Sequence, residues 1–333
     1  MSAALLFAVP ALTLLEPSVV DSLLGDTQGN EAFWREYLAS VDGLALESAD
    51  YLLSEMPRLD RLEMTEAILS DHIFGAIETR SVYYDTLPDS VFFPGLVEYR
   101  VSEEPVTAFR APLYAHWHAV LCNPDSTAAE VAREIAGSIG RFRVRRPTFL
   151  GGVAGPLDVL AAGSGTTDEL RVLFGASLRS MGIAARSVTG YFAHVGQSGW
   201  MEIWDGSRWL PMPLASDSIP DDWEGLAFAV AGNEERTAAL APVGTLILEP
   251  ARMVPESAGA AISVAARGMW VPIDYLEFSP TEDCTLTLGE GEYLLQLTRR
   301  RPSGAVDLWT DLVDILRGAS VTVSLDQLSA GAR

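Results

Sequence analysis

The chain has 333 residues, 48% of them hydrophobic, so it is long enough to bury a core in two or three domains. Its formal net charge of −22 argues against nucleic acid or an anionic membrane surface as a partner, because both attract positive charge. All 23 basic residues are arginine, which excludes Schiff-base and P-loop mechanisms that need a lysine. Arginine-favouring codon usage would give this composition, and so would the removal of primary amines near a reactive acyl donor or aldehyde.

The metal-ligating residue types are sparse. Cys122 and Cys284 are too few for a disulfide framework or a thiolate metal site. His116 and His118 would share one face of a strand, where they could hold a metal only with further ligands, and packing is the simpler interpretation. We therefore predict no metal and no cofactor.

The first fifteen residues are apolar but do not have the pattern of a signal peptide. They contain no lysine or arginine, Pro10 interrupts them, and no clear cleavage site follows. They are also too short to span a bilayer. We predict a buried N-terminal segment, no membrane span and a cytoplasmic protein, with secretion as the alternative.

Residues 16–80 are predicted to be helical. Apolar stripes at helical spacing run through Glu31–Val41, Tyr51–Leu62 and Met64–Ile77. A further helix is expected over Ala128–Ile139, where Thr127 and Glu130 have the spacing of a capping box.

Two charged segments have two interpretations each. Arg100, with Glu103 or Glu104, is expected to form a structural ion pair, although a role in a substrate cleft is the alternative. The basic cluster Arg141–Arg146 could bind an acidic ligand, but in so acidic a chain we expect it to pair with local carboxylates.

The most informative stretch is Gly163–Leu214. Its first half has one apolar helical face, made by Leu170, Leu173, Phe174, Leu178 and Met181. Thr166 and Glu169 stand in capping-box register, so a helix should begin at Thr167 and end at Gly182. A strand is expected over Ser187–Phe192. A hairpin should follow, with strands at Trp200–Trp204 and Arg208–Met212 on either side of Asp205-Gly206.

Beyond Pro213, the acidic stretch Ser216–Glu224 is predicted to be a loop. Residues 238–253 carry a strand-like run, and from about Ala260 the pattern is all β, with turns about every ten residues, which is typical of a small antiparallel sandwich. The expected strands are Thr245–Leu248, Ile262–Val264, Trp270–Ile273, Cys284–Leu288, Tyr293–Leu297 and Val321–Leu325.

The junction "LRSMGIAARSVTGY" resembles that of the transglutaminase-like superfamily, and in particular its multidomain bacterial members. The matching residues are Leu178, Arg179, Gly182, Ile183, Ala185, Arg186, Val188, Gly190 and Tyr191, with Ala184 where the family usually has proline. The hairpin resembles the family's next block through Trp200, Glu202, Gly206 and Trp209. The resemblance implies an α+β chain with a helical N-terminal region (1–110), a papain-like core in which a central helix packs on an antiparallel sheet (111–245), and a C-terminal β-sandwich (246–333).

The resemblance also implies a catalytic cysteine at the start of the central helix, with histidine and aspartate on the following strands. The corresponding positions here are Thr167, Ser198 and Pro213, although "SGWME" would also fit a two-residue deletion that removes the histidine. A papain-like site needs a thiolate, a base and a group that orients the base. We therefore expect no conventional thiol protease or transglutaminase activity.

Three functions remain open. The first is a non-catalytic protein that binds a small-molecule, peptide, glycan or protein ligand in the former cleft. The second is a repurposed enzyme for an acyl-transfer, cyclisation or lyase step, and the third is a purely structural module. A repurposed enzyme would use new residues, for which the candidates are Thr167, Asp168, Glu169, Tyr191, His194 and Glu202. Thr167 would need a base, and carboxylates in a first helical turn also have a structural explanation, since they complement the helix dipole.

Overall fold

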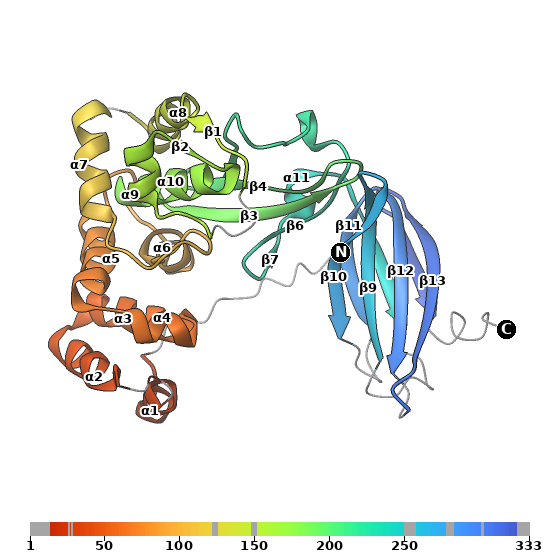
Figure 1. Ribbon diagram of the computed structural model, residues 1–333, viewed down its shortest axis with the longest axis horizontal. Helices are drawn as coiled ribbons and strands as arrows, with labels where there is room; N and C mark the ends of the chain where they lie inside the picture. Colours follow the sequence, from red (N-terminus) through yellow and green to blue (C-terminus); the bar gives the residue numbers. More distant parts are fainter. Residues whose placement is uncertain are drawn as a thin grey trace. The chain divides into compact units, whose positions relative to one another are not determined.

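The computed structural model describes residues 14–25, 27, 29–121, 126–147, 152–249, 258–277, 283–300 and 303–324 (Figure 1). The predicted N-terminal segment, up to residue 13, lies outside these ranges. The chain divides into two compact units. Unit 1 is Met1–Ser187 with Trp200–Ser216, and unit 2 is Val188–Gly199 with Asp217–Arg333.

Unit 1 begins with a helical layer, as the periodicity predicts. Its elements are α1 (Pro17–Gly25), α2 (Glu31–Ser40), α3 (Gly43–Glu55), α4 (Arg58–Glu63), α5 (Glu66–Thr79), α6 (Asp89–Phe92) and the π-helical turn η1 (Phe93–Val97). The stripe Tyr51–Leu62 was expected to form one helix, but it is divided between α3 and α4. Met56 and Pro57 between them are extended, and a proline cannot continue a preceding helix.

The second half of unit 1 surrounds one buried helix. Its elements are α7 (Arg110–Leu121), α8 (Ala128–Ile139), β1 (Arg143–Val144), α9 (Pro156–Ala162), β2 (Ser164–Gly165) and α10 (Thr167–Ser180). Helix α10 packs against α5, α7, α8 and α9 (Figure 1). From Glu169 onwards all its residues except Arg171 are buried, so α10 is the central helix that the sequence predicts.

Both predicted capping boxes are present. The Thr166 backbone N–H donates to Glu169 Oε2 (2.7 Å), and the Glu169 N–H donates back to Thr166 Oγ1 (3.2 Å). Thr127 and Glu130 do the same at the start of α8. After α10, Gly182 has a φ of +84°, and a Cβ there would lie 2.5 Å from the carbonyl oxygen of Thr79. Glycine is therefore required where the chain leaves the helix.

His116 and His118 lie in helix α7, so the expected strand at this position is wrong. Residues two apart on a helix do not share a face. The apolar face of α7 is made by Leu113 and Trp117, four residues apart and both buried, while the two histidines are exposed. Because the buried residues of this segment are four positions apart, its apolar residues repeat with the period of a helix and not with that of a strand.

A five-stranded sheet has the order β5-β4-β3-β6-β7. Its strands are β3 (Ala185–Phe192), β4 (Gly196–Trp204), β5 (Trp209–Met212), β6 (Leu226–Ala231) and β7 (Glu234–Glu235), of which β3 and β4 contribute residues to both units. The predicted hairpin joins β4 to β5, with Trp204 opposite Trp209. Asp205 fixes its turn, because its carboxylate accepts hydrogen bonds from the backbone N–H groups of Ser207 and Arg208.

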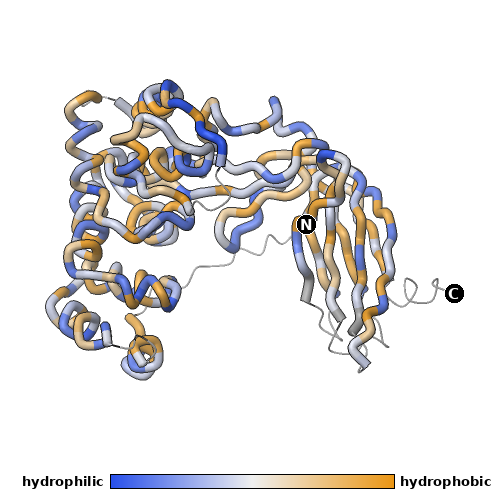
Figure 2. The backbone as a smooth tube through the Cα atoms, viewed as in Figure 1, coloured by the Kyte–Doolittle hydropathy of each residue, from blue (hydrophilic) through white to orange (hydrophobic). Residues whose placement is uncertain are grey.

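The rest of unit 2 is a β-sandwich. One sheet has the order β10-β9-β12-β13 and the other β11-β8-β14. The strands are β8 (Val243–Glu249), β9 (Ala258–Ala266), β10 (Met269–Glu277), β11 (Cys284–Gly289), β12 (Gly291–Arg300), β13 (Val306–Ile315) and β14 (Ser320–Ser324), and a short helix, α11 (Thr237–Leu240), precedes them. Hydrophobic residues recur along these strands (Figure 2), and alternate ones form the core between the two sheets.

Candidate functional site

Thr167 is the first residue of α10 and is half-buried. Pro213 follows β5 in unit 1 and is exposed, while Ser198 lies on β4 within unit 2 and is half-buried. Asp168, beside Thr167, is exposed and pairs with Arg171 at 3.0 Å, one turn further along the helix. An exposed pair of this kind stabilises a helix by at most about 0.5 kcal/mol. Asp168 therefore has the position of an ordinary first-turn carboxylate.

Glu169 is buried and its carboxylate is fully engaged. Besides the capping bond to the Thr166 N–H, it accepts the Ala154 N–H (3.2 Å) and pairs with Arg145 (2.8 Å). Burial raises the pKa of Glu169. The backbone hydrogen bonds and the Arg145 guanidinium together lower it by a larger amount, so the pKa lies below its usual value. A carboxylate held in its ionised form by three donors is a structural anchor for the start of α10.

Glu202 forms the other buried ion pair of the region. It lies on β4 with no exposed surface, and its Oε2 accepts from Arg186 Nε (3.0 Å) and Arg186 Nη2 (2.9 Å). The Arg186 guanidinium also lies 4.2 Å from the centre of the Trp209 ring. The pair therefore joins β3 to the β4–β5 hairpin, and both charges are satisfied within the fold.

Tyr191 and His194 belong to unit 2. Tyr191 pairs with Phe228 of β6 and packs against the core of the sandwich, and burial followed by the charge of Asp274 raises its pKa. His194 is exposed, with a φ of +68°, and its backbone N–H donates to the carbonyl of Ala265 (2.8 Å). The structure thus brings Thr167, Asp168 and Glu169 together in unit 1, and holds Tyr191 and His194 by contacts within unit 2.

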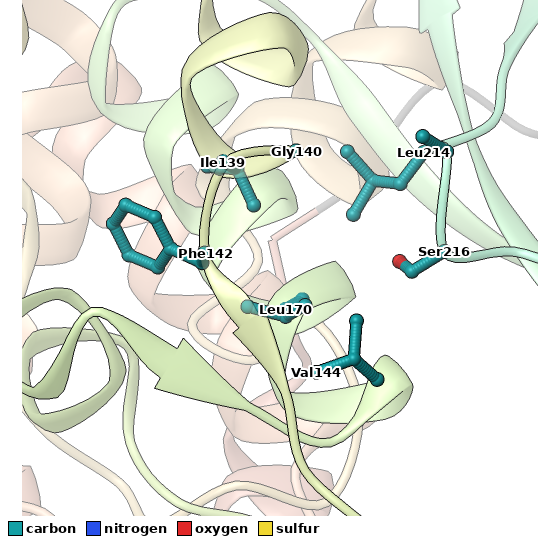
Figure 3. A pocket seen from close by; sticks show the side chains of 8 residues that line it. Ile139, Gly140, Phe142, Val144, Leu170, Leu214 and Ser216 are labelled. Carbon is teal, nitrogen blue, oxygen red and sulfur yellow. The ribbon is translucent and has the colours of Figure 1, made fainter.

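A pocket of about 120 Å³ opens beside the start of α10 (Figure 3). Its lining comes from the end of α8 and the strand after it, from α10, and from the segment after Pro213, and consists of Ile139, Gly140, Phe142, Val144, Leu170, Leu214, Ala215 and Ser216. Leu170 is one turn after Thr167, and Leu214 directly follows Pro213. The pocket therefore adjoins two of the three positions at which the resemblance implies catalytic residues.

The sequence predicts a loop at Ser216 and gives no sign of a functional role for this residue. The Ser216 hydroxyl is the polar side-chain atom of the pocket, and it is buried without a hydrogen-bond partner among the described residues. The sequence carried one weak signal for the pocket, because Phe142 and Val144 alternate with arginines in the segment 141–146.

A second cluster missed by sequence reasoning is structural. Arg110 is fully buried and donates to the carbonyls of Arg179 (2.9 Å) and Leu96, and to His72 Nδ1 (3.3 Å). Arg179 donates in turn to the carbonyls of Ala185 (3.0 Å), Glu98 (3.2 Å) and Arg100. These two arginines satisfy backbone carbonyls between the helical layer and α10, so they bind the first helices to the core.

Arg100 and the basic cluster have partly the roles expected. Arg100 forms a structural ion pair, but its partner is the buried Asp60 at 2.8 Å and not the expected Glu103 or Glu104; the Glu104 carboxylate instead accepts from the backbone N–H groups of Val101 and Ser102. Of the basic cluster, Arg145 pairs with Glu169, whereas Arg141, Arg143 and Arg146 are exposed and form no ion pair with a carboxylate of the described residues.

In the described part of the chain, no three His, Cys, Asp or Glu side chains are grouped as metal ligands.

Helices α5 and α10 have 14 residues each, about 21 Å at 1.5 Å per residue. None of the helices within the described ranges has the length and hydropathy to cross a bilayer.

Comparison with known proteins identifies the core. Curated proteins include no match to the chain. A solved structure of a candidate cysteine protease from Cytophaga hutchinsonii is similar at 12% identity, with 70% of this chain and 60% of that one covered and a TM-score of 0.32. A candidate protease from Parabacteroides distasonis is similar at 14% identity, with 62% and 49% covered and a TM-score of 0.31. The chain thus spans about half to three-fifths of the length of these two proteins. The family model described as "Transglutaminase-like superfamily" matches residues 117–213, and this segment of the chain is therefore a transglutaminase-like core.

Proposed function

We propose that this chain is a non-catalytic member of the transglutaminase-like superfamily that binds a peptide in the former active-site cleft, at the start of α10. A glycan or a whole protein would use the same site. The proposal takes Thr167, Ser198 and Pro213 as replacements of the cysteine, histidine and aspartate that the family's chemistry requires.

One observation carries the proposal: the carboxylates that a repurposed enzyme would need are already paired. Glu169 and Glu202 are buried in ion pairs at 2.8 and 2.9 Å, and Asp168 pairs with Arg171. A general acid or base must present a carboxylate oxygen to the reacting group, whereas both oxygens of Glu169 and Oε2 of Glu202 already accept hydrogen bonds from arginine or backbone donors. This arrangement favours binding over the alternative of a repurposed acyl-transfer, cyclisation or lyase enzyme.

Binding and turnover can be measured in one experiment. The purified chain is incubated with a library of short peptides of mixed sequence, the bound peptides are recovered, and both bound and unbound fractions are analysed by mass spectrometry. We expect a subset of peptides to be enriched on the protein with unchanged masses. Peptides cleaved, cyclised or joined at a rate above that in buffer would overturn the proposal in favour of the enzyme, and no enrichment of any peptide would overturn it as well.

A matched pair of variants separates catalysis from structure. Asp168→Asn removes an exposed charge, and Glu169→Gln removes a buried one. If the protein is a binder, neither variant changes the mass of any recovered peptide. If one of them abolishes a conversion that the parent catalyses, with a loss of about a hundredfold or more, that residue is an acid or base and the chain is an enzyme.

A further inference from the structure

The pocket beside α10 has a size that selects its occupant. An apolar cavity of about 150 Å³ in another protein holds one benzene molecule, so about 120 Å³ accommodates a compact group of roughly four to six carbon atoms. Ile139, Leu170 and Leu214 give the pocket aliphatic walls, and Val144 lies at its mouth, 53% exposed. A branched aliphatic group fits this lining, whereas an indole ring does not fit the volume.

The Ser216 hydroxyl gives the pocket one directional polar contact. Figure 3 shows its oxygen pointing into the space between Leu170, Leu214 and Val144. Because this oxygen is buried and has no partner among the described residues, a ligand that supplied a hydrogen-bond acceptor would satisfy it. Small-molecule sites commonly combine an apolar lining with a few such groups.

The charge beside the pocket is positive, in contrast to the net charge of −22 for the whole chain. Phe142 and Val144 line the pocket; on this extended segment Arg146 shares their face, Arg143 lies on the opposite face, and Arg141 precedes them. These three guanidinium groups are exposed and form no ion pair within the described ranges. Since guanidinium groups recognise carboxylates well, this segment attracts an anion that the rest of the surface repels.

We propose that the pocket binds a small branched aliphatic group attached to a carboxylate, as at the C-terminus of a peptide that ends in leucine. The aliphatic group fills the space between Ile139, Leu170 and Leu214. The Ser216 hydroxyl donates a hydrogen bond to a ligand oxygen, and Arg146, on the same face of the segment as Phe142 and Val144, attracts the carboxylate. This inference rests on the proposed function and specifies the ligand of the same site.

The test is a titration of the full chain, followed by ligand-observed NMR, with N-acetyl-leucine as the probe. N-acetyl-leucinamide lacks only the charge, and we expect it to bind about threefold to tenfold more weakly. N-acetyl-tryptophan exceeds the volume and should not compete. A free acid, 4-methylpentanoate, distinguishes the two sources of this chemistry: binding as tight as that of N-acetyl-leucine indicates a short fatty acid, and tighter binding of a peptide ending in leucine indicates a peptide terminus.

Two variants and one control locate the binding. Val144→Trp places a large ring over the mouth of the pocket and should weaken binding of N-acetyl-leucine at least tenfold, whereas Val120→Trp, at a position on α7 that is 62% exposed, should leave it unchanged. Ser216→Ala should weaken binding several-fold without lowering the unfolding temperature, because it removes an unpaired buried hydroxyl. If Ser216 had only a structural role, its replacement would not weaken binding while leaving the unfolding temperature unchanged.

The results separate the two proposals. If peptides are captured from the library but Val144→Trp and Ser216→Ala bind them as the parent does, the pocket assignment is overturned and the binding function stands. If N-acetyl-leucine binds equally to the parent and to Val144→Trp, the pocket assignment is again overturned. If no peptide is captured while N-acetyl-leucine or 4-methylpentanoate binds in the pocket, the proposal of peptide binding is overturned. The assignment of the pocket to a branched aliphatic carboxylate then still holds.

Discussion

Replacing Glu202 tests whether this residue holds the fold together or performs chemistry. Its carboxylate is buried on β4 and accepts two hydrogen bonds from Arg186, at 2.9 and 3.0 Å. In Glu202→Leu the Arg186 guanidinium, whose side chain is only 13% exposed, would keep its charge without this partner. The variant should therefore be strongly destabilised, independently of any ligand.

The magnitude follows from the geometry. Two unit charges 2.9 Å apart attract by about 6 kcal/mol at an effective dielectric constant of about 20, and desolvation offsets much of this. Removing one partner of a buried pair typically costs about 3–5 kcal/mol, because the other charge stays buried. At roughly 2–4 °C per kcal/mol for a unit of this size, Glu202→Leu should unfold about 6–20 °C below the parent. Glu202→Gln keeps an acceptor and should lose less.

The assay is thermal unfolding at pH 7, followed by circular dichroism and calorimetry. Arg186→Met and the double variant with Glu202→Leu complete a cycle, and the double variant should be more stable than the sum of the single losses predicts. Asp168→Asn, which affects only an exposed pair, is the matched control and should shift the midpoint by less than about 2 °C. If Glu202→Leu unfolds at the temperature of the parent, the structural role assigned to this ion pair is wrong.

Three further predictions concern unit 1. His72 is fully buried and donates from Nε2 to the carbonyl of Thr107 (3.0 Å); burial, followed by the charge of Arg110, lowers its pKa. The unfolded chain therefore takes up a proton below about pH 6.5 that the folded chain does not, so stability should fall as the pH drops from 7 to 5, and His72→Gln should reduce this slope in denaturant titrations. Gly182→Ala should destabilise by several kcal/mol (about 3 or more) because it adds a steric clash to a positive φ, whereas Gly206→Ala, with a positive φ in open space, should cost about 1–2 kcal/mol. Thr166→Ala removes the cap of α10 and should cost about 1 kcal/mol in the same titrations; a loss below about 0.3 kcal/mol would contradict the capping assignment.

Local signals in the sequence predicted the elements well. The capping boxes at Thr166 and Thr127 fix the starts of α10 and α8, since each bond joins residues only three apart. Asp205-Gly206 predicted the hairpin for the same reason. The sequence does not predict strand β13, because Leu308 and Leu312 are apolar on its exposed face while Asp307 and Asp311 lie on the other face, although the strand pairs along its whole length with β12. β12 and β13 are consecutive in the chain, so the partner is near; the miss arises because backbone pairing does not require a regular alternation of side chains.

The site was less predictable because its partners are distant in sequence. The sequence alone makes Glu202 a candidate acid or base, whereas in the structure it pairs with Arg186, sixteen residues earlier in the chain. Glu169 likewise pairs with Arg145, which lies 24 residues earlier in the chain. The pocket combines α8, α10 and the segment after Pro213, and the hydroxyl of Ser216 becomes informative only when its lack of a partner is known. Spacing along a chain does not contain this information.

Hydrogen–deuterium exchange of the chain with and without its captured peptides tests the central claim most directly. The account predicts slower exchange in residues 139–144 and 214–216, which line the pocket, while the recovered peptide keeps its mass. Protection confined to the strands of the sandwich in unit 2, or a peptide recovered with an altered mass, would contradict the claim that this transglutaminase-like core binds its ligand at the start of α10 without reacting with it.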